Sequence, residues 1–105
     1  MSEYNFLRES ENFVSPINKL QQLMTVTAEE CGELTQACMK VMRKYDNIED
    51  LRNSKFYENL IEEAGDVLCM LDLLVCNDII KEKDLLERAN VKEIKLRKWS
   101  TIFED

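Results

Sequence analysis

The stretch INKLQQLMTVTAEECGELTQACMKV, residues 17–41, decides the class of fold. Its apolar and small residues recur in steps of three and four, at Ile17, Leu20, Met24, Thr27, Cys31, Leu34, Cys38 and Val41. This spacing is typical of an amphipathic α-helix. Ser15 and Pro16 precede the stretch as an N-cap residue and a first-turn proline, so we predict a helix from about residue 17 to residue 43.

Two more helices are predicted downstream. The stretch FYENLIEEAGDVLCMLDLLV, residues 56–75, forms the second, and residues 82–99 form the third. Between the first two, residues 44–55 are polar and carry a turn signal at Asp46 and Asn47. Residues 67–75 are apolar on nearly every side, interrupted only by Asp72. A monomer of 105 residues can hardly bury such a helix, which favours a homo-oligomer.

Composition agrees with a helical fold. The 105 residues suffice for one domain, which we place at residues 1–105. Hydrophobic residues make up 45% and charged residues 33%, a balance typical of a globular protein. Two glycines and one proline are too few for the turns of a many-stranded sheet, so the expected class is all-α.

Charge and residue content exclude several functions. The formal net charge is −7, from 21 acidic and 14 basic residues, which argues against nucleic acid as a partner. No histidine is present, which excludes Ser-His-Asp and Cys-His catalysis and imidazole zinc sites. The cysteine pairs Cys31/Cys38 and Cys69/Cys76 are spaced by seven, too far along a helix for neighbouring ligands of one zinc ion. No stretch reads as a signal peptide or membrane span, so we expect reduced thiols, a cytoplasmic location and no membrane partner.

Two acidic pairs stand out by their position on the predicted helices. Spacing of three puts each pair on one side of its helix, among apolar residues: Glu30 and Glu33 with Leu23, Val26 and Ala37, and Glu63 and Asp66 with Met70 and Leu73. Four inward carboxylates are costly without a counter-ion. Two explanations are open: the carboxylates bind a hard cation such as Mg²⁺ or Mn²⁺, or they pair with lysines at a helix–helix seam.

Both acidic pairs lie in motifs of a known family. Residues 29–34, EECGEL, followed by residues 62–68, EEAGDVL, resemble the EExxE…ExxD signature of the MazG-like all-α nucleoside triphosphate pyrophosphohydrolases. Residues 92–99, KEIKLRKW, resemble the basic last helix of small single-domain members, including phage-type ones. The resemblance extends over about residues 17–99. It implies a MazG-like helical bundle, with a four-helix-type core completed by homo-oligomerisation into a dimer or tetramer.

The resemblance also implies a reaction and a set of site residues. The reaction is hydrolysis of a (deoxy)nucleoside triphosphate to the monophosphate and pyrophosphate, dependent on Mg²⁺ with Mn²⁺ as a substitute. Glu30, Glu33, Glu63 and Asp66 match the family's magnesium ligands. The candidates for binding substrate phosphates are basic residues of the last helix: Lys92, Lys95 and Arg97. The base and sugar are left open.

Several roles stay open at the level of sequence. Glu29 and Glu62 are either assisting groups or solvated side chains, and Lys92 either binds a phosphate or extends past Trp99 to water. Asp72 either forms a hydrogen bond across a subunit interface or contacts the nucleotide. The alternative function is a non-enzymatic helical adaptor that dimerises through residues 67–75. Binding of Mg²⁺ distinguishes the enzyme from the adaptor.

Overall fold

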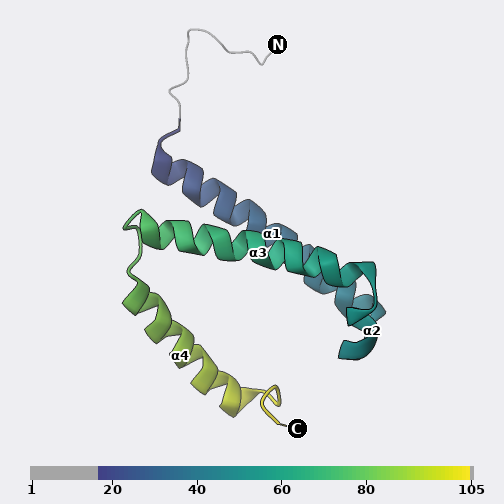
Figure 1. Ribbon diagram of the computed structural model, residues 1–105. Helices are drawn as coiled ribbons and strands as arrows, with labels where there is room; N and C mark the ends of the chain where they lie inside the picture. The colour runs from purple at the N-terminus through teal and green to yellow at the C-terminus, as the bar shows by residue number, and fades with distance from the viewer. Residues whose placement is uncertain (1–16, 105) are drawn as a thin grey trace, which may run out of the picture.

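The computed structural model describes residues 17–104 of the chain (Figure 1). It contains four helices, α1 (Lys19–Lys44), α2 (Ile48–Arg52), α3 (Lys55–Cys76) and α4 (Glu82–Trp99), and no strand within that range. The all-α class expected from the sequence is thereby confirmed.

Helix α1 begins two residues later than predicted. Asn18 caps it: its side-chain Oδ1 accepts a hydrogen bond from Gln21 N at 2.8 Å, and Gln21 Oε1 accepts one from Asn18 N at 2.9 Å. This reciprocal capping box satisfies two backbone donors that a bare helix end leaves unpaired. The expected cap, Ser15 followed by Pro16, lies outside the described residues.

The segment between the two long helices is more ordered than predicted. Helix α2 occupies five of its residues, where the sequence indicated only a turn. Asn47 starts this helix, because its Oδ1 accepts from Asp50 N at 2.9 Å. Five residues are too few to display an apolar period, which is why the pattern of hydrophobic residues missed α2.

Helix α3 ends in a Schellman motif that sends the chain into α4. Ile79 N donates to Leu74 O at 2.9 Å, and Asp78 N donates to Val75 O at 3.0 Å. Asp78 takes the left-handed position of this motif with φ of 60°. Helix α4 then runs away from the other helices (Figure 1) and has the bounds predicted from the sequence.

The core lies between α1 and α3, which pack side by side and antiparallel (Figure 1). Three residues within it are buried: Ala37 from α1, and Met70 and Leu74 from α3. The Cα radius of gyration is 19.1 Å, against about 13 Å expected for a compact domain of this length. One copy of the chain therefore leaves much of its apolar surface uncovered.

Candidate metal centre

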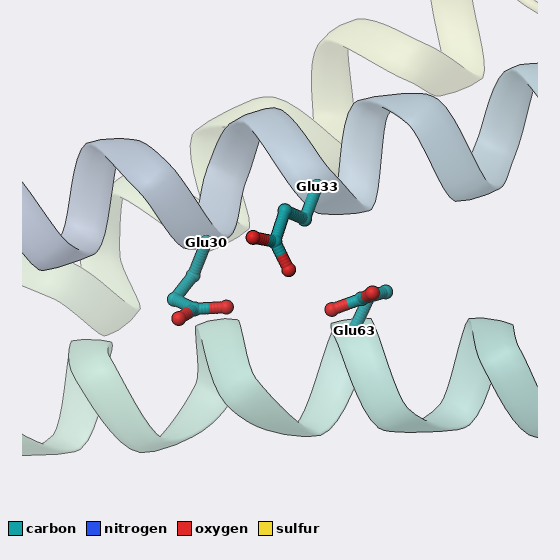
Figure 2. A group of neighbouring side chains, drawn as sticks. All are labelled: Glu30, Glu33 and Glu63. Carbon is teal, nitrogen blue, oxygen red and sulfur yellow. The ribbon is translucent and has the colours of Figure 1, made fainter.

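Two helices bring three carboxylates together at the α1–α3 seam. Glu30 and Glu33 extend from α1 toward α3, and Glu63 extends from α3 toward them (Figure 2). One carboxylate oxygen from each of the three lies within 4.8 Å of the others. The spacing of three along α1 and the antiparallel packing of α3 produce this convergence.

Two of the three carboxylates are partly withdrawn from water. Glu30 and Glu63 are half-buried, and the Oε1 atom of each has almost no contact with solvent and no hydrogen-bond partner. Burial raises the pKa of Glu30 above its usual value, and the charges of Glu33, Asp66 and Glu29 raise it further. Burial also raises the pKa of Glu63, followed by the charges of Glu33, Glu62 and Asp66. The neighbouring carboxylates therefore destabilise the charges on Glu30 and Glu63.

No cation of the described chain compensates this charge. Among residues 17–104, no lysine or arginine forms an ion pair with Glu30, Glu33, Glu63 or Asp66. The ion pair present in that range joins Arg97 to Glu93 within α4. The sequence left two explanations open for the acidic pairs. One of them, pairing with lysines across the seam, is not observed in this part of the chain.

Asp66 lies at the edge of the group. It is exposed and does not belong to the three residues whose oxygens lie within 4.8 Å of one another. Its charge nevertheless acts on both Glu30 and Glu63. Glu29 and Glu62 are exposed and add to the same repulsion, which agrees with the wet helix sides expected for them.

The donor atoms of this group fit a hard divalent cation. All are carboxylate oxygens, which Mg²⁺ and Mn²⁺ prefer, and neither nitrogen nor sulfur ligands stand beside them. A bound cation would also satisfy the two buried oxygens that lack partners. Residues 17–104 contain no other group of three acidic or cysteine side chains that converge this closely, so the residues singled out from the sequence include the whole group.

The predicted phosphate-binding residues lie elsewhere. Lys92, Lys95 and Arg97 are exposed on α4, which runs away from the α1–α3 pair (Figure 1). Arg97 is engaged within its own segment: it pairs with Glu93 at 3.0 Å and stacks 4.2 Å above the ring of Phe103. One copy of the chain therefore does not bring these three residues together with the carboxylates.

Asp72 borders a separate pocket. This pocket of about 160 Å³ lies where α4 meets α3, and its walls include Leu68, Val75 and Leu85. The Cys76 thiol donates to Asp72 Oδ2 at 3.9 Å. Asp72 thus lies apart from the three converging glutamates.

Comparisons with protein families, with curated proteins and with solved structures found no match. None of the described helices combines the length and the apolar character that a membrane crossing requires.

Proposed function

We propose that this chain is a MazG-like nucleoside triphosphate pyrophosphohydrolase. The reaction is hydrolysis of a (deoxy)nucleoside triphosphate between its α and β phosphates, which yields the monophosphate and pyrophosphate. It depends on Mg²⁺, for which Mn²⁺ can substitute. The resemblance of residues 29–34 and 62–68 to the family signature supplies the reaction.

One observation supports the proposal above the rest. Carboxylate oxygens of Glu30, Glu33 and Glu63 converge within 4.8 Å, and two of these residues carry a buried oxygen with no hydrogen-bond partner. Such an arrangement is unfavourable for the apo protein, since burial and mutual repulsion both oppose ionisation. A divalent cation reverses this penalty, because it stabilises every carboxylate that it contacts.

The acidic and the basic residues have separate roles in the proposed reaction. Glu30, Glu33 and Glu63 would hold the cation from both sides of the seam, and Asp66 would add to the negative field beside it. When bound, Mg²⁺ neutralises the phosphate charge and lowers the pKa of an attacking water. Lys92, Lys95 and Arg97 are the proposed phosphate-binding residues. They can bind substrate phosphates at an acidic site only if α4 lies close to that site.

The proposal includes an assembly and a location. We propose a four-helix-type core completed by homo-oligomerisation, as a dimer or tetramer, because α1 and α3 alone bury only a few side chains. A cytoplasmic location agrees with four free cysteines, since disulfides are rare in a reducing compartment.

Product analysis tests the proposed reaction. Purified protein is incubated with Mg²⁺ and a panel of ribo- and deoxynucleoside triphosphates, and products are separated by ion-exchange chromatography. We expect monophosphate and pyrophosphate in equal amounts, with no product in EDTA. Release of orthophosphate with a diphosphate, or turnover that survives EDTA, contradicts the proposal. The panel also identifies the preferred base and sugar.

A further inference from the structure

Helix α4 carries an apolar stripe that no other described helix covers along its length. The stripe consists of four residues that lie within about 80° of one another around the helix axis: Leu85, Ala89, Leu96 and Trp99. Leu85 and Leu96 are half-buried, whereas Trp99 is 83% exposed. The stripe begins at the pocket of about 160 Å³ between α3 and α4, to which Leu85 contributes. Beyond that pocket, neither long helix of residues 17–104 packs along α4 (Figure 1).

Basic residues follow one edge of this apolar stripe. Lys92 lies within the stripe, and Arg88 and Lys95 lie within about 40° of Trp99 on the same side of the helix. None of these three forms an ion pair with a residue of the described range. Helix α4 has six basic and four acidic residues, in a chain whose formal net charge is −7. The stripe and its basic edge therefore favour an occupant that is both apolar and acidic.

The 16 residues that precede the described range have this composition: MSEYNFLRESENFVSP, residues 1–16, which we call the N-terminal segment. After Met1 the segment contains five large apolar residues: Tyr4, Phe6, Leu7, Phe13 and Val14. Three glutamates and one arginine give its side chains a net charge of −2. Its charge is thus opposite to that of α4, and its apolar side chains match the stripe.

The position of α1 brings the N-terminal segment within reach of α4. Because α1 and α3 are antiparallel, Lys19 at the start of α1 lies at the same end of the pair as the turn from α3 into α4 (Figure 1). Helix α4 extends about 27 Å from that turn, and 16 residues span about 24 Å as a helix or more than about 50 Å when extended. A tether of this kind gives an effective concentration on the order of millimolar. The segment is therefore favoured over a second copy at micromolar concentration.

We infer that the N-terminal segment packs on α4 of the same chain. Its apolar side chains cover the stripe, and its glutamates lie beside the basic edge. The inference goes beyond the proposed reaction, in which substrate phosphates would have to displace those glutamates from Lys92 and Lys95. A second copy of the chain is the alternative occupant of the stripe.

Fluorescence of Trp99 measures whether the stripe is covered, because the chain has one tryptophan. The full-length wild type is compared with Tyr4→Ser/Leu7→Ser/Phe13→Ser, which removes three apolar side chains from the segment and leaves the net charge unchanged. We expect acrylamide to quench the wild type at least about twofold more slowly than this variant, since packing on one face of the indole ring blocks about half of the approach to it. Equal quenching in the two proteins overturns the inference.

A matched variant and a concentration series identify the occupant. Asn5→Ser/Asn12→Ser changes polar residues of the same segment and should retain wild-type quenching. Cover by a tethered segment should be the same at about 1 µM and about 100 µM protein. Cover that increases with concentration assigns the stripe to a second copy and overturns the inference. Far-UV circular dichroism verifies that every variant stays helical.

A charge exchange tests the contact with the basic edge. Glu9→Lys/Glu11→Lys should speed the quenching of Trp99 at low salt, because it places positive charge against the edge. Adding Lys92→Glu/Lys95→Glu to this variant reverses both partners and should return quenching to the wild-type rate. Quenching that the first exchange leaves unchanged, or that the second does not return, overturns the inference.

The control for this exchange makes the same change of charge on the opposite side of α4. Lys83 and Lys98 lie there, more than a third of a turn from the stripe. Adding Lys83→Glu/Lys98→Glu to Glu9→Lys/Glu11→Lys should leave quenching fast. Equal recovery with both lysine pairs would show a general effect of net charge and overturns the inferred position of the segment.

Discussion

At the scale of single residues, the site is defined by carboxylates that oppose one another's charge. Replacing Glu by Gln keeps the shape of the side chain and removes the charge that a cation requires. We expect Glu30→Gln, Glu33→Gln and Glu63→Gln to reduce pyrophosphate release by at least about tenfold to a hundredfold, the range found when groups that support a metal site are changed. Asp66→Asn belongs to the same test, and its position at the edge of the group predicts a smaller loss.

The neighbouring glutamates supply the matched controls for these variants. Glu29→Gln and Glu62→Gln make the same chemical change one position away, on exposed sides of α1 and α3. We expect each to cost less turnover than its inward neighbour. Steady-state pyrophosphate release at saturating Mg²⁺ measures the difference. Wild-type turnover in both Glu30→Gln and Glu63→Gln would contradict the assignment of these residues to a metal site.

The raised pKa values of Glu30 and Glu63 predict an unusual dependence of stability on pH. The folded protein holds a proton on each group more tightly than the unfolded chain does, whose carboxyls titrate near the ordinary value of 4.5. Stability from these groups is therefore complete below that ordinary value and is lost as the pH rises through the raised folded values. Without metal, the melting temperature should rise as the pH falls from about 7.5 to about 5.

The double variant Glu30→Gln/Glu63→Gln isolates this contribution. Its melting temperature in EDTA should change less with pH than that of the wild type, because the two groups with raised pKa are gone. The double variant Glu29→Gln/Glu62→Gln should retain the wild-type slope. Equal slopes in all three proteins would show that burial and repulsion at the seam do not affect stability.

At the scale of elements, the turn after α3 contains a residue in an unfavourable backbone conformation. Asp78 adopts φ of 60° in the position that glycine normally occupies at the end of a helix. Since glycine has no Cβ to strain there, Asp78→Gly should raise the free energy of unfolding by about 0.5–1 kcal/mol. Asp84→Gly, the same change in the first turn of α4, should lower it by about 0.5–1 kcal/mol, because glycine is a poorer helix former than aspartate and a favourable negative charge at the helix N-terminus is lost. Urea denaturation measures both, and a loss of stability in Asp78→Gly would contradict the account of this turn.

The elements also show how far the sequence determines the structure. The bounds of α1, α3 and α4 follow from apolar periodicity to within two residues, because each is long enough to repeat its pattern several times. The bounds of α2 do not follow from apolar periodicity, since this short helix depends on the Asn47 cap. The convergence of Glu30, Glu33 and Glu63 follows from spacing plus antiparallel packing. The direction of α4 does not follow from the sequence. The apolar side of α4 indicates that another element packs against it, but does not indicate which element.

At the scale of the whole molecule, binding of Mg²⁺ decides between the enzyme and the helical adaptor. A ligand that binds only the folded state adds about 2.7 kcal/mol of stability at a hundred times its dissociation constant. For a chain of this size, that corresponds to a rise in melting temperature of roughly 10 °C or more. We expect this rise in the wild type, because Mg²⁺ removes the repulsion at the seam as well as binding there. An adaptor has no reason to show it.

General screening by salt must be separated from binding at the seam, because a chain of net charge −7 is stabilised by any cation that shields it. Melting curves are therefore recorded in MgCl₂ and in NaCl at equal ionic strength. The wild type should gain more in MgCl₂ than in NaCl, and Glu30→Gln/Glu63→Gln should gain equally in both, because it keeps the net charge strongly negative but lacks two of the three converging carboxylates. A gain specific to Mg²⁺ that survives in this double variant places the cation elsewhere. No specific gain in the wild type favours the adaptor, which would dimerise through residues 67–75.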